Sequence, residues 1–228
     1  MTNLKNVLVI FCVATLIAVA WFRKAPDDYN KSGIVKLTNG NYKGAEVDFS
    51  GAIQGAEDSV FYRNRSYVRR LQSNNTNALA DLNRAVQLNS NNADAYYDRG
   101  FTELELGNFQ ASVSDLSKYI EQYPFNSEAY FARGLALQKI QKLDEAIADY
   151  DTGIRLNPKN PKIFLLRGCV KMKLRNFSGG ITDFTSAIEL QTNNALAYKA
   201  RAYGYKAKGD LTGFTNDWNF YLQFNRTN

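Results

Sequence analysis

The stretch SEAYFARGLALQKIQKLDEAIADYDTGIRLNPKN, residues 127–160, decides how this chain folds, because imperfect copies of it recur from residue 26 onwards. Counted from its first residue as position 1, it has an aromatic residue at position 4, glycine at 8, alanine at 20, a second aromatic residue at 24 and proline at 32. These residues are Tyr130, Gly134, Ala146, Tyr150 and Pro158. The same residue types return at the same spacing before and after the stretch.

Aligned to this stretch, the chain falls into six units: residues 26–58, 59–92, 93–126, 127–160, 161–194 and 195–228. Position 4 is aromatic in all six: Tyr29, Tyr62, Tyr96, Tyr130, Phe164 and Tyr198. Position 8 is small in all six: Gly33, Ser66, Gly100, Gly134, Gly168 and Ala202. Small residues at positions 8 and 20 allow the two helices of a unit to approach closely, and a large residue at position 24 fills the core.

The spacing and residue types resemble the tetratricopeptide repeat (TPR), a 34-residue helix–turn–helix unit. Two prolines at position 32, Pro124 and Pro158, agree with this register because proline cannot continue the second helix of a unit. The resemblance implies an all-α fold: a right-handed superhelical α-solenoid of six repeats over residues 26–228, preceded by one N-terminal hydrophobic helix.

Two charged positions mark an arginine variant of the repeat, since the family usually has leucine at position 7. Arginine stands there in five units: Arg65, Arg99, Arg133, Arg167 and Arg201. Aspartate stands at position 23 in all six: Asp48, Asp81, Asp115, Asp149, Asp183 and Asp217. An anion-binding row is one interpretation. The matched number and spacing favour a ladder of ion pairs instead, because an unpaired buried charge is costly.

The ladder allows two pairing schemes. If each arginine pairs within its own unit, Asp48 is left without a partner, since its unit has Ser32 at position 7. If each aspartate pairs with the arginine of the next unit, Asp217 is left over.

Residues 1–24 form a separate segment that we expect to direct the chain to a membrane. Sixteen uncharged, mostly apolar residues, 7–22, lie between Lys5 and the pair Arg23 and Lys24. A transmembrane helix needs about 20 apolar residues, and the small residues at 18–20 match the exit of a cleavable signal peptide. The aromatic and basic residues after that exit favour a retained anchor, with a cleaved signal and a buried helix of the fold as alternatives. Because the N-terminal tail is short, we expect the repeats on the outer side of the membrane.

The composition excludes several classes of function. The chain has no histidine and only two cysteines, Cys12 and Cys169, which excludes histidine-dependent triads, disulfide frameworks and cysteine-based zinc sites. No nucleotide-binding or metalloprotease motif occurs, so we expect no catalytic residue, no metal, no cofactor and no enzyme activity. The net charge is +6, and half of that excess precedes the repeats, so we expect no nucleic-acid partner.

The resemblance implies a ligand groove, because first helices in the family line a concave face through positions 2, 5, 9, 12 and 13. In this chain those positions give an apolar and aromatic middle flanked by basic residues. The candidate groove residues are Arg63, Tyr67, Arg70, Tyr97, Phe101, Phe131, Leu135, Lys139, Cys169, Lys173, Lys199, Tyr203 and Lys206. Such a surface suits a peptide with hydrophobic anchors and acidic residues. The alternative is that the aromatic residues pack on one another without a ligand.

The last unit departs from the pattern in its second helix, which carries many aromatic residues where an array usually ends in a polar cap. The aromatic residues are Phe214, Trp218, Phe220, Tyr221 and Phe224. They either fold back onto their own repeat or form an exposed patch used for self-association.

These features together predict a non-catalytic protein–protein interaction scaffold, membrane-tethered or exported, that binds a peptide segment of another protein in its concave groove. The alternative is a self-assembling structural module, a homo-oligomer held together by the aromatic C-terminal helix.

Overall fold

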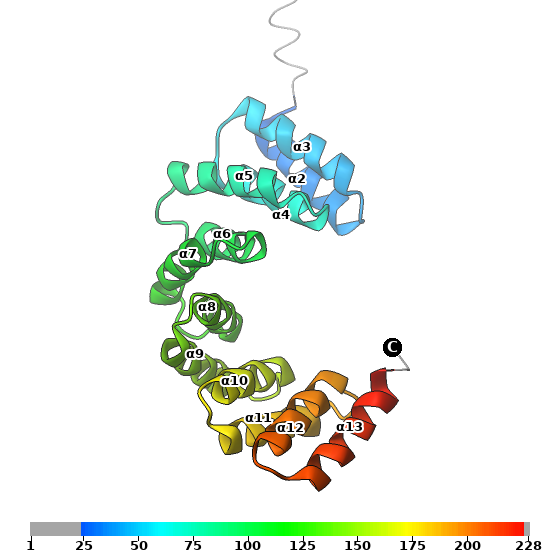
Figure 1. The fold of residues 1–228 in the computed structure, drawn as a ribbon. Helices are drawn as coiled ribbons and strands as arrows, with labels where there is room; N and C mark the ends of the chain where they lie inside the picture. The colour runs from blue at the N-terminus through cyan, green and yellow to red at the C-terminus, as the bar shows by residue number, and fades with distance from the viewer. Residues whose placement is uncertain (1–23, 226–228) are drawn as a thin grey trace, which may run out of the picture. The chain divides into compact units, whose positions relative to one another are not determined.

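A computed structural model describes residues 24–225, in which twelve α-helices form six helical hairpins (Figure 1). The helices are α2 (Pro26–Thr38), α3 (Tyr42–Gly55), α4 (Ser59–Leu71), α5 (Asn75–Leu88), α6 (Ala93–Leu106), α7 (Phe109–Gln122), α8 (Ser127–Lys139), α9 (Leu143–Leu156), α10 (Pro161–Lys173), α11 (Phe177–Leu190), α12 (Ala195–Ala207) and α13 (Leu211–Asn225). They divide into two compact units, with α2–α5 in the first, up to Ser90, and α6–α13 in the second, from Asn91.

Asparagine precedes most of these helices, and in six of them its side chain caps the first turn. The side chain of Asn126 accepts hydrogen bonds from the backbone N–H groups of Glu128 and Ala129 at 3.0 and 3.2 Å. These bonds satisfy donors that have no partner inside the helix. At the other end, α7 and α9 both stop two residues before a proline, Pro124 and Pro158, as the sequence predicts.

A short turn joins the two helices of each hairpin, and one of its residues adopts the left-handed conformation. Glycine, which reaches positive φ without steric cost, holds this place in three hairpins: Gly40, Gly107 and Gly209. Ser73, Gln141 and Arg175 hold it in the other three, with φ of 60°, 66° and 62°. Because an L residue there costs about 1 kcal/mol or more, the packing of the two helices must outweigh that strain.

The two helices of a hairpin approach most closely where a small residue at position 8 faces a large one at position 24. A Cβ atom on Gly134 would lie 2.8 Å from Cε1 of Tyr150, and one on Gly168 would lie 2.6 Å from Cε1 of Phe184. Tyr150 and Phe184 are themselves fully buried. The expected pairing of small and large positions is therefore confirmed in these hairpins, which have no space for an extra methyl group.

Within each unit, consecutive hairpins stack through neighbouring helices. In the first unit α3 packs against α4, and in the second α7 packs against α8, α9 against α10 and α11 against α12. The first helices of successive hairpins also contact one another, α6 with α8, α8 with α10 and α10 with α12. These four helices share one side of the second unit, which we name the first-helix face (Figure 1).

The segment predicted to enter a membrane, residues 1–24, lies outside the described residues apart from Lys24. None of the helices between residues 24 and 225 has the length and apolar character needed to cross a bilayer. The retained anchor, the cleaved signal and the buried helix all stay predictions.

Candidate functional site

The position-7 arginines pair with the position-23 aspartates of their own hairpins. The Nε and Nη2 atoms of Arg133 donate to the two carboxylate oxygens of Asp149 at 2.8 and 2.7 Å. The hydrogen bond to Asp149 raises the pKa of Arg133, and burial opposes that effect. The same bidentate ion pair forms between four more pairs of residues: Arg65–Asp81, Arg99–Asp115, Arg167–Asp183 and Arg201–Asp217. The predicted ion-pair ladder is confirmed, and its pairing is within the hairpin.

In four of these five arginines, a third donor reaches back to the preceding hairpin of the same unit. Nη1 of Arg133 donates to Oγ of Ser117 at 3.0 Å, and Nη1 of Arg201 donates to Oγ1 of Thr185 at 3.0 Å. Arg65 bonds Ser50 and Arg167 bonds Asp151 in the same way. Because these donors are already engaged, the arginines hold the fold together and do not offer a row of free anion-binding groups.

Asp48, in the hairpin without a position-7 arginine, is held by two other side chains. Ser32 donates its hydroxyl to this carboxylate at 2.6 Å, and Nζ of Lys36 lies 2.7 Å from the same oxygen. Burial alone would raise the pKa of Asp48, but the hydrogen bonds from Lys36 and Ser32 outweigh it, so the pKa lies below its ordinary value. The expectation that Asp48 lacks a partner is therefore wrong, because Lys36 supplies the charge one turn along the helix.

The predicted groove residues fall in both units. Three of them lie on α4 of the first unit, where Tyr67 is exposed and Arg63 and Arg70 are half-buried. The other ten lie on α6, α8, α10 and α12, the four helices of the first-helix face. The structure therefore brings the second group together on one face.

An apolar strip runs along the first-helix face. The ring of Tyr97 lies 4.7 Å from that of Phe101 and 4.6 Å from that of Tyr119 on α7, measured between centroids. Phe131 packs at the edge of the core around α8 and α9, and Leu135 is half-buried one turn further on. Tyr97 and Phe101 do pack on other aromatic rings, as the alternative expects, and Tyr97, Phe101 and Phe131 are still only half-buried.

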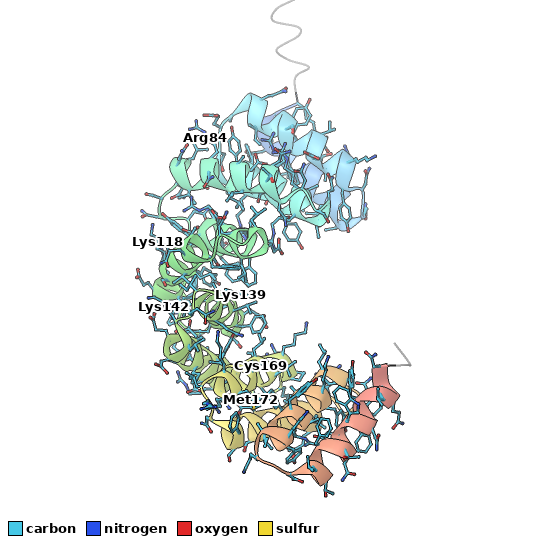
Figure 2. The ribbon with its side chains drawn as sticks, viewed as in Figure 1. Arg84, Lys118, Lys139, Lys142, Cys169 and Met172 are labelled. Atoms are coloured by element: carbon cyan, nitrogen blue, oxygen red, sulfur yellow. The ribbon has the colours of Figure 1, made fainter. Side chains whose placement is uncertain are left out.

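Four lysines flank this strip, and none of them pairs with a carboxylate anywhere in residues 24–225. Lys139, Lys173 and Lys206 are exposed, and Lys199 is half-buried. Figure 2 shows Lys139 on α8 and Cys169 on α10. Three of the four lysines have uncharged neighbours: Lys173 bonds Gln141, Lys199 lies 5.1 Å from the ring of Tyr221, and Lys206 lies 5.5 Å from that of Phe214. The face therefore has a positive charge that the described residues do not neutralise.

Cys169 lies half-buried in the middle of this face. Burial raises the pKa of its thiol, so little of the reactive thiolate forms near neutral pH. This agrees with the interpretation that Cys169 fills space. Between residues 24 and 225, no group of three or more histidine, cysteine, aspartate or glutamate side chains is placed to hold a metal ion.

The predicted C-terminal patch lies on α13, and its aromatic rings contact one another and α12. Trp218 stacks on Phe214 with 5.6 Å between centroids and meets the ring of Tyr203 edge-on at 5.9 Å. On the other side of the helix, Phe220 lies 5.0 Å from Tyr198. These contacts match the interpretation in which the aromatic residues fold back onto their own repeat, while self-association stays a prediction.

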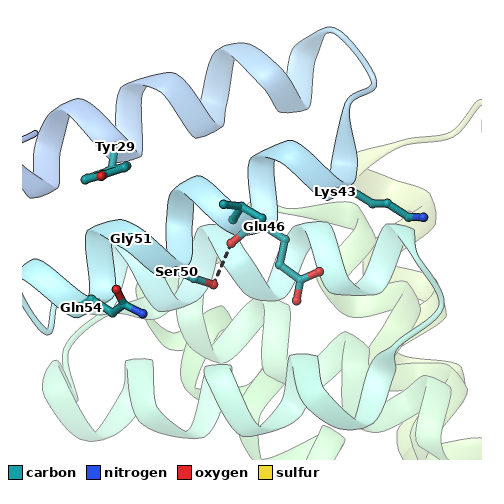
Figure 3. Close-up of a pocket in the computed structure, with 7 residues that line it drawn as sticks. Tyr29, Lys43, Glu46, Ser50, Gly51 and Gln54 are labelled. Atoms are coloured by element: carbon teal, nitrogen blue, oxygen red, sulfur yellow. Dashed lines mark hydrogen bonds between the residues drawn. The ribbon is translucent and has the colours of Figure 1, made fainter.

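A hollow of about 610 Å³ opens on the first unit, away from the predicted groove residues. It lies between Tyr29 of α2 and the side of α3 that carries Val47 and Gly51, with Glu46 and Ser50 along one rim (Figure 3). A signal for it was present in the sequence, because Gly51 stands at a position where the other five units have larger residues: Arg84, Lys118, Thr152, Ser186 and Phe220.

A second hollow, of about 600 Å³, lies at the turn between α7 and α8. Its walls include Tyr119, Tyr123 and Phe125, and the side chain of Phe125 is 83% exposed. A signal for it was present in the sequence, because the next unit has Asn157 and Lys159 at the positions of Tyr123 and Phe125.

Comparisons with known proteins identify these paired helices by sequence and by fold. Sequence profiles of the tetratricopeptide repeat match residues 63–138 and 127–160. Residues 63–160 contain tetratricopeptide repeats. A search of curated protein sequences finds no match to the chain.

Solved structures show the same TPR fold over most of the chain. PilF of Pseudomonas aeruginosa is 18% identical, covering 89% of this chain and 97% of its own, with a TM-score of 0.70. A tetratricopeptide repeat protein of Parabacteroides merdae is 19% identical, covering 87% and 79%, with a TM-score of 0.73. YrrB, described as a TPR protein with an unusual peptide-binding site, is 18% identical, covering 77% and 91%, with a TM-score of 0.68. Identities this low show a common fold alone.

Proposed function

We propose that this TPR chain is a non-catalytic scaffold that binds a peptide segment of another protein on its first-helix face. TPR repeats are consistent with a protein–protein interaction scaffold. The observation that carries the proposal is the set of four lysines without carboxylate partners beside half-buried aromatic and aliphatic side chains. The peptide-binding site of YrrB, a protein of the same fold, gives loose support.

The chemistry of the face indicates what the peptide carries. Apolar anchors would bury the accessible parts of Phe101, Phe131 and Leu135, where most of the binding energy of such contacts arises. Acidic residues on either side of the anchors would pair with Lys139 and Lys173. Because those charges are exposed, they speed and orient binding more than they strengthen it.

Peptide selection followed by charge reversal tests the proposal. We expect short peptides selected from a random library on the full chain to combine acidic residues with large apolar ones. The variant with Lys139→Glu and Lys173→Glu should bind them at least about tenfold more weakly, the equivalent of 1.4 kcal/mol. Lys159→Glu, an exposed change in the α9–α10 turn, is the matched control. Selected peptides that keep full affinity for the double variant would rule out binding at this face.

We propose further that residues 1–24 tether the chain to a membrane or direct its export, with the repeats on the outer side. The support is the run of sixteen uncharged residues between Lys5 and Arg23. Sequencing the N-terminus of the mature protein distinguishes the two forms, since a start after Ala20 means cleavage of a signal and a start at Met1 means a retained anchor.

A further inference from the structure

The hairpin junctions inside the two units all accept an incoming helix through the same contacts. An arginine on that helix donates to a side chain on the second helix of the preceding hairpin, as Arg133 does to Ser117 and Arg201 does to Thr185. The same arginine lies over the aromatic ring three residues before it, at 5.5 Å for Arg133 and Tyr130. The aromatic ring and the guanidinium group therefore lie on the same side of the incoming helix.

The accepting helix contributes a hydrogen-bond acceptor and, three residues later, an aliphatic residue. The Oγ of Ser117 donates to the backbone oxygen of Val113 at 2.8 Å, which turns its lone pairs towards the arginine. Two of the four aliphatic residues, Ile120 after Ser117 and Ile188 after Thr185, are only 8% and 7% exposed, because the incoming helix covers them. The other two, Ile53 and Ile154, are half-buried.

Helix α13 presents the same two positions with no described residue covering them. Asn219 stands at the acceptor position and Leu222 three residues later. Asn219 is exposed and its side-chain amide has no partner in residues 24–225. Leu222 is 39% exposed, against 7% for Ile188. The aromatic rings of α13 do not close this edge, because they contact α12 and one another.

The number of buried residues differs between α13 and α11, the second helix of the preceding hairpin. Asp217 is the one buried residue that α13 has, whereas α11 buries five: Gly180, Asp183, Phe184, Ala187 and Ile188. The difference lies in the face that the next helix would cover, since the contact of α13 with its own first helix, α12, is as extensive as in the other hairpins.

We propose that the edge of α13 formed by Asn219 and Leu222 binds an amphipathic helix of a partner protein. The partner helix carries an aromatic residue and an arginine three positions later, with a small residue directly after the arginine. Its arginine donates to the amide oxygen of Asn219 and stacks on its own aromatic ring. An apolar residue of the same helix covers Leu222. The interface thus continues the series of junctions already present within each unit.

A second copy of this chain fits the edge less well. The first hairpin is the one that would stack there head to tail, and it has Ser32 where the other hairpins have arginine. Serine neither reaches Asn219 in the way arginine does nor stacks on Tyr29, so two of the three contacts would be missing.

A helical peptide provides a direct probe. The sequence of α12, ALAYKARAYGYKA, contains the required residues, and a hydrocarbon cross-link on its outer side would hold it helical. We expect the fluorescently labelled peptide to bind the full chain in an anisotropy titration. Replacing its arginine by glutamine should weaken binding about tenfold, since a hydrogen bond from a charged donor is lost.

Substitutions on the chain complete the test. Leu222→Asp should weaken binding at least about tenfold, whereas Leu196→Asp, an equally drastic change at an exposed leucine of the same hairpin, should not. Thermal melts followed by circular dichroism check that both variants fold. The double reversal of Lys139 and Lys173 should leave binding of this peptide unchanged, which separates this edge from the first-helix face.

Three results would overturn the proposal. The peptide fails to bind at any concentration, it binds Leu222→Asp as tightly as the natural chain, or its glutamine form binds equally well. A fourth result would also contradict the proposal: light scattering of the chain alone shows a concentration-dependent dimer, and Leu222→Asp abolishes it. In that case the edge binds a second copy of this chain.

Discussion

Four of the five position-7 arginines, Arg65, Arg133, Arg167 and Arg201, make three kinds of contact at once. Arg133 pairs with Asp149 on its own hairpin, donates to Ser117 on the preceding hairpin and lies over the ring of Tyr130. Charged residues are expensive to bury, and this network repays the cost by engaging both ends of the ion pair. The arginine gives the hairpins that carry it a directional contact as well as the apolar ones.

Removing one partner of the pair should therefore be costly. We expect Asp149→Ala to lower the free energy of unfolding by about 3 kcal/mol, because it leaves the guanidinium of Arg133 largely buried without its counter-charge. The measurement is urea unfolding followed by circular dichroism.

The control lies on the same helix. Glu145 pairs with Lys142 at 2.9 Å on the surface, and Glu145→Ala should change the free energy of unfolding by no more than about 0.5 kcal/mol. Equal effects of the two substitutions would contradict the ladder's role in stability. Replacing both members, Arg133→Met with Asp149→Leu, should recover most of the loss.

At the scale of the element, the glycines at position 8 set how close two helices lie. Gly134 lies over the ring of Tyr150, whose hydroxyl donates to Gln138 at 2.9 Å and so keeps the ring from moving aside. The glycine weakens α8 as an isolated helix, and the hairpin gains close contact in return.

Adding a single methyl group tests this balance. We expect Gly134→Ala to destabilise the chain by about 1–2 kcal/mol, since overpacking against Tyr150 outweighs the gain in helix propensity. Gly153→Ala is the matched change in α9, where the nearest atom to the new Cβ is a terminal methyl of Ile163 at 3.3 Å. That variant should be neutral or slightly more stable in a thermal melt, and a larger loss for Gly153→Ala than for Gly134→Ala would contradict the argument.

The stability of the whole molecule depends on how neighbouring hairpins are coupled. In repeat arrays the total is approximately a sum of the stability of each repeat and of each junction. The junctions inside the two units contain a hydrogen bond from a position-7 arginine beside their apolar contacts, so this bond can be removed without touching the core.

Ser117→Ala removes that bond at the junction of α7 and α8 and keeps the pair Arg133–Asp149. We expect a loss of about 1 kcal/mol and a smaller dependence of the unfolding free energy on urea, because the hairpins on either side no longer unfold together. Ser114→Ala, an exposed position on the same helix, should change neither quantity. An unchanged urea dependence in Ser117→Ala would show that the apolar contacts alone couple the hairpins.

The sequence by itself determined the helical hairpins and the ladder. Spacing of small, aromatic and proline positions predicted where helices start, stop and touch, because these depend on residues within one repeat. The matched counts of arginine and aspartate predicted the ion pairs for the same reason. The sequence also predicted which residues occupy the first-helix face, although nothing yet tests whether that face binds a ligand.

Only the tertiary structure decided what depends on neighbouring hairpins. It showed that the arginines pair within their hairpin and reach back to Ser117 or Thr185, that Lys36 neutralises Asp48, and that no residue between 24 and 225 covers Leu222 or Asn219. Such facts depend on how far a side chain reaches across a junction and on what covers it. The repeat pattern of the sequence shows neither the reach of a side chain nor what covers it, because the pattern is the same at a covered junction and at an uncovered one.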